Sequence, residues 1–279
     1  MIDRRTFVVG AAALLAMPAV PAFARRAAAV RPIGLQLYTL RTLFAADPVA
    51  TLEQVARIGY REVEYGGGGY EAMDPAELRR TMDRVGLRAP AVHLGYEALS
   101  ERFDRSVAMA KTLGADTVVL PYAEDRYRTE EGWRALVAGM NRIAARLADQ
   151  GLGFAYHNHD FEFTTRPGGI SLYDRLIRDA DPKLVRFELD LFWAIEAGQD
   201  PLALIRRLAG RIYSYHVKDR TAAGKMTSVG AGTVDFAGIF RLNAQAGVRH
   251  FFVENDEAPA PYLPDVTASY THLSRLLGR

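Results

Sequence analysis

From residue 33 onward the chain alternates between short apolar runs and longer amphipathic runs, and the alternation occurs eight times. The short runs have the length of β-strands. No linker or change of composition interrupts the pattern, so we predict parallel βαβ units of the α/β class closed into a single (β/α)8 TIM barrel. A doubly wound open sheet is the alternative, but no glycine-rich nucleotide-binding turn follows the first run. The predicted strands cover residues 33–40, 62–66, 88–94, 115–122, 152–159, 185–190, 212–219 and 250–256.

The amphipathic runs carry residues typical of helix termini. Three of them begin with an Asp-Pro pair, at 47–48, 74–75 and 200–201, in which the aspartate is the expected N-cap and the proline the first helical residue. Glycine is favoured just past a helix end because it adopts the left-handed conformation without strain. We therefore expect helices to end at Gly59, Gly86, Gly114, Gly151, Gly210 and Gly247.

Residues 1–24 differ from the rest of the chain. They have a basic front, an apolar middle too short for a confident membrane span, and an Ala-Phe-Ala ending at 22–24. Arg4 and Arg5, followed by Thr-Phe-Val, resemble a twin-arginine export signal. We expect cleavage after Ala24, a periplasmic location, a barrel formed by residues 25–279, and no stable membrane association after cleavage. An uncleaved anchor is the alternative.

The composition excludes several classes of site. The chain has no cysteine, so it has neither disulfides nor thiol chemistry. Its formal net charge is +2, which becomes +1 when the segment carrying Asp3, Arg4 and Arg5 is removed. A nearly neutral chain provides no electrostatic reason to bind nucleic acid or an anionic membrane.

Ionisable side chains gather at the ends of the predicted strands, and active sites of (β/α)8 barrels lie at the carboxyl ends of their strands. Alternate residues of a strand share a face, so His157 and His159 are expected to point the same way. Placing so many ionisable groups together is costly unless they are paired or bind a cation. The residues at these ends are Glu62, Glu64, His93, His157, Asn158, His159, Glu188, Asp190, His216, Lys218, Asp219, Glu254, Asn255 and Asp256.

Three consecutive strands provide Asp190, His216 and Glu254, and His157 lies at the right depth to be a fourth ligand. Nitrogen and oxygen ligands without thiolate suit one divalent ion, such as Mn, Mg, Co or Zn. Each residue has a simpler interpretation, because a lone histidine is often a hydrogen-bonded core residue and a lone carboxylate is often a cap or an ion-pair partner. The convergence of four neighbouring strands favours a metal site.

Seven segments carry a resemblance to a known superfamily. They are "IGLQLYTLR", "YHNHDFEF", "FELDLFW", "AGQDP", "YHVKD", "VGAGTVDF" and "FVEND". Together they resemble the xylose isomerase-like barrel superfamily, and within it the sugar phosphate isomerases/epimerases, alongside ketose 3-epimerases and inosose dehydratases. The resemblance implies a metal held by Glu, Asp, His and Glu. The last three match Asp190, His216 and Glu254, whereas His157 stands in place of the first glutamate.

The resemblance implies a sugar isomerase or epimerase that removes the proton next to a carbonyl of a sugar or keto-sugar. We expect Glu254 or His159 to carry the proton and Lys218 to stabilise an oxyanion or bind a hydroxyl. Glu64 and His93 are candidate contacts for substrate hydroxyls.

Other residues keep two interpretations. Glu188 is either an extra ligand or a partner of His157, and the alternative is an ion pair with Arg186 or Lys218. Trp193 and Phe161 offer apolar faces to a sugar ring or simply pack in the core. The remaining expectations are solvated or capping roles for Asp160 and Glu162, a mobile loop at residues 66–69, and Asp235 as the cap of the seventh helix.

Replacement of one epimerase glutamate by His157 makes elimination the main alternative. A lyase or dehydratase acting on 3-keto-glycosides or keto-inositols would use the same proton abstraction. Apurinic endonucleases of the superfamily use more histidines and a basic surface, and a non-catalytic periplasmic sugar-binding protein would not need the converging ligands. We expect a small-molecule carbohydrate as the partner. The sequence is compatible with a homodimer but leaves the oligomeric state open.

Overall fold

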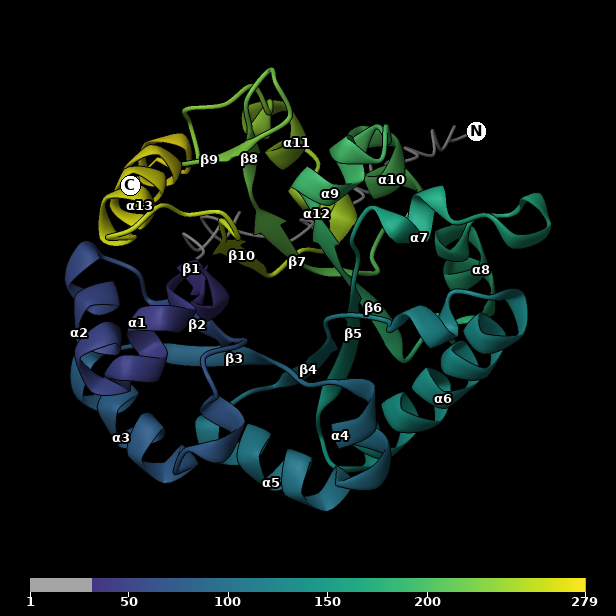
Figure 1. Ribbon diagram of the computed structural model, residues 1–279, viewed down its shortest axis with the longest axis horizontal. Helices are drawn as coiled ribbons and strands as arrows, with labels where there is room; N and C mark the ends of the chain where they lie inside the picture. The colour runs from purple at the N-terminus through teal and green to yellow at the C-terminus, as the bar shows by residue number, and fades with distance from the viewer. Residues whose placement is uncertain (1–31, 279) are drawn as a thin grey trace, which may run out of the picture. The chain divides into compact units, whose positions relative to one another are not determined.

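The computed structural model describes residues 32–278, so the predicted signal segment 1–24 lies outside them and stays a prediction. Eight parallel strands form a closed barrel in the order β1-β10-β7-β6-β5-β4-β3-β2, as predicted. Figure 1 looks down this barrel and shows the helices arranged around it. The barrel strands are β1 (Ile33–Gln36), β2 (Glu62–Tyr65), β3 (Arg88–His93), β4 (Thr117–Leu120), β5 (Gly153–His157), β6 (Val185–Asp190), β7 (Ile212–Val217) and β10 (His250–Val253).

The helices between the strands are more fragmented than the eight predicted ones. A short hairpin, β8 (Asp219–Arg220) and β9 (Met226–Thr227), follows β7. Within residues 32–278, no helix combines the length and the apolar character needed to cross a membrane. The α-helices are α1 (Arg41–Ala46), α2 (Pro48–Ile58), α3 (Pro75–Val85), α4 (Tyr96–Glu101), α5 (Phe103–Leu113), α6 (Glu130–Asp149), α7 (Phe161–Thr164), α8 (Leu172–Asp179), α9 (Leu191–Glu196), α10 (Pro201–Arg207), α11 (Phe236–Phe240), α12 (Asn243–Ala246) and α13 (Leu263–Leu276).

The predicted N-caps are confirmed. Asp47, Asp74 and Asp200 each accept a hydrogen bond from a backbone N–H in the first turn of α2, α3 and α10. Asp235 caps α11 in the same way. The glycine stop predicted for α10 is wrong, because this helix ends at Arg207 and its C-cap is Leu208.

All the predicted strands except 185–190 are shorter than expected, and the ends of β1 and β10 are two examples. The chain leaves β1 at Gln36 and enters a 3-10 helix, Leu37–Leu40, while β10 ends at Val253. After β1 the apolar pattern continues because the following turn still packs against the core, with Leu37 and Leu40 buried. Apolar residues outside the strand therefore lengthened the first prediction, whereas the predicted extension of β10 consists of polar residues 254–256.

The barrel interior is filled rather than open. Five fully buried side chains form a layer inside it, provided by Ala91, Val119, Ala155, Tyr213 and Phe252. Along β3, β5 and β10, the next inward-facing residues toward the carboxyl end are His93, His157 and Glu254, two positions further on. The apolar layer therefore supports a polar cluster at the face where the strands end.

Candidate metal and substrate site

The carboxyl ends of β5, β6, β7 and β10 bring the predicted ligands together. Asp190 pairs in register with His216 on the neighbouring strand, and Glu188 pairs with His157. Ligand atoms of Asp190, His216 and Glu254 all lie within 4.8 Å of one another. The three side chains are at most 5% exposed, so the group is held in a largely water-free environment.

Both nitrogens of the His216 ring have carboxylate partners. Nδ1 lies 2.6 Å from Glu254 Oε2, and Nε2 lies 2.7 Å from Glu64 Oε2 and 2.9 Å from Glu188 Oε1. Burial lowers the pKa of His216, but the Glu188 and Glu254 carboxylates outweigh it and raise the pKa well above its usual value. His216 thus belongs both to this ligand group and to a second group of possible ligands.

The second group consists of His93, His157, Glu188 and His216, whose ligand atoms also lie within 4.8 Å of one another. Glu188 Oε1 lies 2.8 Å from His93 Nε2, and Glu188 Oε2 accepts a 2.6 Å hydrogen bond from Ser214 Oγ. The alternative ion pair of Glu188 with Arg186 or Lys218 is therefore wrong.

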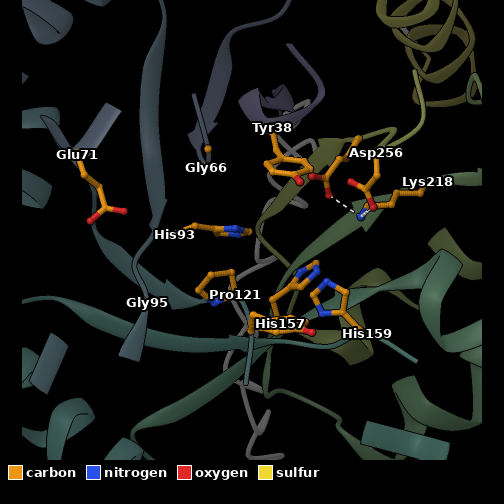
Figure 2. A pocket seen from close by; sticks show the side chains of 13 residues that line it. Tyr38, Gly66, Glu71, His93, Gly95, Pro121, His157, His159, Lys218 and Asp256 are labelled. Carbon is orange, nitrogen blue, oxygen red and sulfur yellow. Dashed lines mark hydrogen bonds and ion pairs between the residues drawn. The ribbon is translucent and has the colours of Figure 1, made fainter. Parts of the chain in front are cut away.

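Lys218 lies among three carboxylates. Its Nζ is 3.0 Å from Asp190, 2.8 Å from Glu254 and 2.8 Å from Asp256, and Figure 2 shows the ammonium beside Asp256. Burial alone would lower the pKa of Lys218, but these three groups raise it well above its usual value. Lys218 therefore carries a proton and can donate hydrogen bonds at the cavity wall.

A cavity of about 440 Å³ opens above these groups (Figure 2). Of the predicted site residues, His93, His157, His159, Lys218 and Glu254 line it. Glu64, Glu188, Asp190 and His216 are completely buried beneath it, and Trp193 lies beside His159 with the ring centroids 5.7 Å apart. Substrate contact by Glu64, Glu188 and Trp193 stays a prediction.

The donor set fits a divalent cation. Asp190 Oδ2 and His157 Nδ1 are buried and make no well-directed hydrogen bond, although Asp190 Oδ2 forms an ion pair with Lys218 Nζ at 3.0 Å. His157 Nδ1 is 3.2 Å from Glu188 Oε1, and His157 Nε2 is 3.7 Å from Asp190 Oδ2. The five carboxyl groups of Glu64, Glu188, Asp190, Glu254 and Asp256 outnumber the nearby cationic groups, so a bound cation would offset the excess negative charge.

Residues 52–268 match the family described as xylose isomerase-like TIM barrel. The chain belongs to this family. This chain is 30% identical over 151 residues to the inosose dehydratase of Geobacillus thermodenitrificans. The matched segment covers 47% of this chain and half the length of that relative. The chain is 27% identical over 249 residues to the inosose dehydratase of Clostridium beijerinckii, covering 75% of this chain and 82% of that one. A sugar phosphate isomerase/epimerase structure from Parabacteroides distasonis shares the fold, with a TM-score of 0.77 at 24% identity over 89% of this chain and 95% of that chain.

Within this family barrel, the loop after β5 differs from what its sequence predicted. Glu162 was expected to be solvated or to act as a cap, but it is fully buried and accepts hydrogen bonds from Tyr156 Oη at 2.7 Å and from the His159 backbone N–H at 2.8 Å. Burial raises the pKa of Glu162 to about 8. The solvated interpretation is wrong because the short helix α7 turns Glu162 inward beneath His159.

His159 lines the cavity, and its Nδ1 has no hydrogen-bond partner. Burial, followed by the charges of His157 and Lys218, lowers its pKa well below the usual value, so the imidazole is neutral. Figure 2 shows His157 and His159 side by side at the cavity floor.

Sequence reasoning did not single out Gln36, and it placed Asp256 at a strand end without giving it a role in the site. Gln36 Nε2 donates a 2.8 Å hydrogen bond to Glu64 Oε2, and Asp256 lines the cavity while it pairs with Lys218. A glutamine inside the apolar run "IGLQL" was the available signal for the first. Asp256 lies two residues after Glu254, and this spacing was the signal for the second.

Proposed function

We propose that the protein is an enzyme that binds one divalent metal ion and removes the proton next to a carbonyl of a sugar or keto-sugar. The observation that carries this proposal is the convergence of Asp190, His216 and Glu254 within 4.8 Å beneath the cavity. These three residues would hold the ion, with His157 or Glu188 as the fourth ligand. The ion would supply Lewis-acid polarisation of substrate oxygens.

The residues that line the cavity provide the proton transfers. Glu254 is positioned to accept the proton from carbon, since its carboxylate reaches both the cavity and the ligand group. The neutral imidazole of His159 can accept a proton on another side of the substrate, and the imidazolium that forms can return it. Lys218 would donate a hydrogen bond to the oxygen on which negative charge develops.

Isomerisation or epimerisation is the first outcome that we propose for this step. Return of the proton to a neighbouring carbon gives an isomer, and return to the opposite face of the same carbon gives an epimer. Glu254 and His159 both line the cavity and provide two separate groups for removal and return.

Elimination is the second candidate, and two observations favour it. The position of the first epimerase glutamate is occupied by His157, which leaves one carboxylate of the expected acid/base pair. The relatives from Geobacillus thermodenitrificans and Clostridium beijerinckii are named inosose dehydratases. Loss of a substituent β to the carbonyl would make this protein a lyase.

The test is proton exchange in D₂O, followed by NMR, with metal-loaded mature protein and a panel of ketoses, keto-inositols and 3-keto-glycosides. Deuterium in one carbon together with an isomeric sugar would establish isomerase or epimerase chemistry. Release of water or an aglycone would establish a lyase. Absence of exchange with every substrate, in protein with a full complement of metal, would refute the proposal. Asp190→Asn is the metal-site control, and Asp200→Asn, at a helix cap outside the site, is its matched control.

We further propose export of the folded protein to the periplasm by the twin-arginine route, on the basis of the sequence of residues 1–24. An exported enzyme would meet unphosphorylated carbohydrates. The same proposal implies no stable association with a membrane after cleavage.

A further inference from the structure

Aromatic side chains are exposed at the cavity mouth. Among the described residues, the large hydrophobic side chains that are exposed are Tyr38 at 38%, Tyr122 at 44% and Ile170 at 40%. Both tyrosines line the cavity, whereas Ile170 does not. An exposed tyrosine presents an apolar ring face together with a hydroxyl, which suits a ligand that has both kinds of surface.

The two rings come from different sides of the barrel. Tyr38 follows β1 and Tyr122 follows β4, with β2 and β3 between them in the sheet. Figure 2 shows Tyr38 above His93 and Pro121, the residue before Tyr122, below it. Both tyrosines line the same cavity as His93 and His157, so one ligand can contact the histidines and the tyrosine rings together.

Arginines hold both rings in place. The Arg41 guanidinium lies 4.3 Å from the centroid of the Tyr38 ring and donates a 2.9 Å hydrogen bond to the Tyr38 carbonyl oxygen. Arg128 donates a hydrogen bond to Tyr122 Oη, and its guanidinium lies 3.6 Å from the centroid of the Phe161 ring. Rings that are already ordered lose little conformational freedom when a ligand binds.

The glycine run at residues 66–69 makes room for Tyr38. A Cβ on Gly67 would lie 2.6 Å from Tyr38 Cδ2, and the positive φ of 68° at Gly67 also favours glycine. A Cβ on Gly66 would lie 2.6 Å from Gln36 Oε1. The run therefore lets the backbone approach two side chains of the site, one at the floor and one at the mouth.

The cavity offers little to a phosphate group. Among the described residues that line it, Lys218 is the single lysine or arginine, and three carboxylates already pair with it. Arg128 is engaged by the carbonyl of Ala123 at 3.2 Å and by Asp125 at 3.1 Å. A phosphate dianion would therefore meet carboxylates instead of a free cation.

We propose that Tyr38 and Tyr122 form a second subsite, which binds the non-reacting ring of an unphosphorylated glycoside while the carbonyl-bearing ring lies on the floor. The inference rests on the proposed function for the position of the reacting ring. The volume of about 440 Å³ lies within the range of roughly 300–1,000 Å³ that encloses drug-sized ligands. The proposed substrate class is a glycoside with two rings.

A binding assay tests this subsite without any reaction. Methyl, phenyl and glucosyl glycosides of glucose, galactose, mannose and xylose would be titrated into the metal-loaded mature protein and followed by ligand-observed NMR. We expect at least one sugar for which a second ring tightens binding about tenfold over the methyl glycoside. Tyr38→Ala and Tyr122→Ala should each reduce that preference, and the double variant should abolish it. Tyr38→Phe keeps the ring and should keep the preference.

Ile170→Ala is the matched control, because it also removes an exposed large apolar side chain but lies outside the cavity, and it should leave the preference unchanged. Equal affinity of methyl and two-ring glycosides across the whole panel would overturn the proposal, as would a preference that persists in the double alanine variant. Failure of the proposed function has a different signature: no keto-sugar would exchange deuterium, while the binding preference for two-ring glycosides would remain.

Discussion

At the scale of single residues, one aspartate performs two functions. Asp190 Oδ1 accepts a 2.9 Å hydrogen bond from the Trp193 backbone N–H and so caps α9, whereas Asp190 Oδ2 faces the ligand group and pairs with Lys218 Nζ at 3.0 Å. The sequence interpretations of Asp190 as a metal ligand and as a helix cap are therefore compatible. The capping role belongs to one oxygen of the carboxylate and the ligand role to the other.

This division predicts different effects for two substitutions. Asp190→Asn keeps a capping oxygen, so it should retain stability but bind metal at least about 100-fold more weakly. Asp190→Ala should lose metal and also about 1 kcal/mol of unfolding free energy, because the cap is removed. Denaturant titration and metal analysis after dialysis measure both quantities. Wild-type metal content in the asparagine variant would show that Asp190 is not a ligand.

Glu162 predicts a specific pH dependence of stability. Its pKa is raised from 4.5 to about 8 in the folded protein, mainly by burial. The folded state therefore holds the proton more tightly than the unfolded state, and the stability contribution is complete below about pH 4.5 and is lost as the pH rises through about 8. Glu162→Gln stays neutral, so its unfolding free energy should increase relative to wild type between pH 5.5 and 8.5.

The matched control for that comparison is Glu131→Gln, at an exposed position in the first turn of α6. The difference in unfolding free energy between Glu131→Gln and wild type should stay constant over the same pH range. Denaturant unfolding at four or five pH values suffices. If the differences in unfolding free energy from wild type change with pH in the same way for Glu162→Gln and Glu131→Gln, burial of Glu162 has no effect on the pH dependence of stability.

At the scale of elements, strand positions were predicted better than the segments that follow them. Alternation placed His157 and Glu254 on inward faces because a strand has a period of two residues. The path after β5 was not predictable in this way, since α7 is a four-residue helix whose inward turn buries Glu162. Its position depends on Tyr156 and on the backbone of His159 as hydrogen-bond donors.

The glycine loop after β2 allows a test at this scale. Alanine at a residue with positive φ costs roughly 1–2 kcal/mol, and Gly67→Ala adds a contact of 2.6 Å between its Cβ and Tyr38. Gly69→Ala has a similar φ of 74° but no heavy atom within 4 Å of its Cβ. We expect Gly67→Ala to lose more unfolding free energy than Gly69→Ala. Equal losses would mean that Tyr38 moves aside freely.

At the scale of the whole molecule, barrel closure brings carboxylates from opposite parts of the chain together. Glu64 on β2 lies 2.7 Å from His216 on β7, across the barrel, although 152 residues separate them in sequence. The concentration of carboxyl groups in a buried environment is unfavourable unless cations neutralise it. A metal that binds the folded protein should therefore stabilise the entire barrel.

Metal removal should lower the thermal midpoint. Metal at about 100 times its dissociation constant contributes about 2.7 kcal/mol, which corresponds to roughly 5–10 °C in a chain of this size. Differential scanning calorimetry with and without EDTA measures the shift. Asp190→Asn provides the control, because its midpoint should not respond to EDTA. A wild-type midpoint that does not respond either would contradict a bound metal that stabilises the fold.

The amino-acid sequence by itself determined the eightfold alternation, the capped helices and the inward positions of His157, His216 and Glu254, because these features follow from local periodicity and local hydrogen bonding. Tertiary structure alone decided that Gln36 meets Glu64, that Asp256 reaches Lys218 and that Tyr38 and Tyr122 flank one opening. The members of each pair come from different strands or from the segments that follow them, and closure of the barrel sets their distances. Packing between distant segments depends on the whole chain, so the hydrophobic period of one segment cannot predict it.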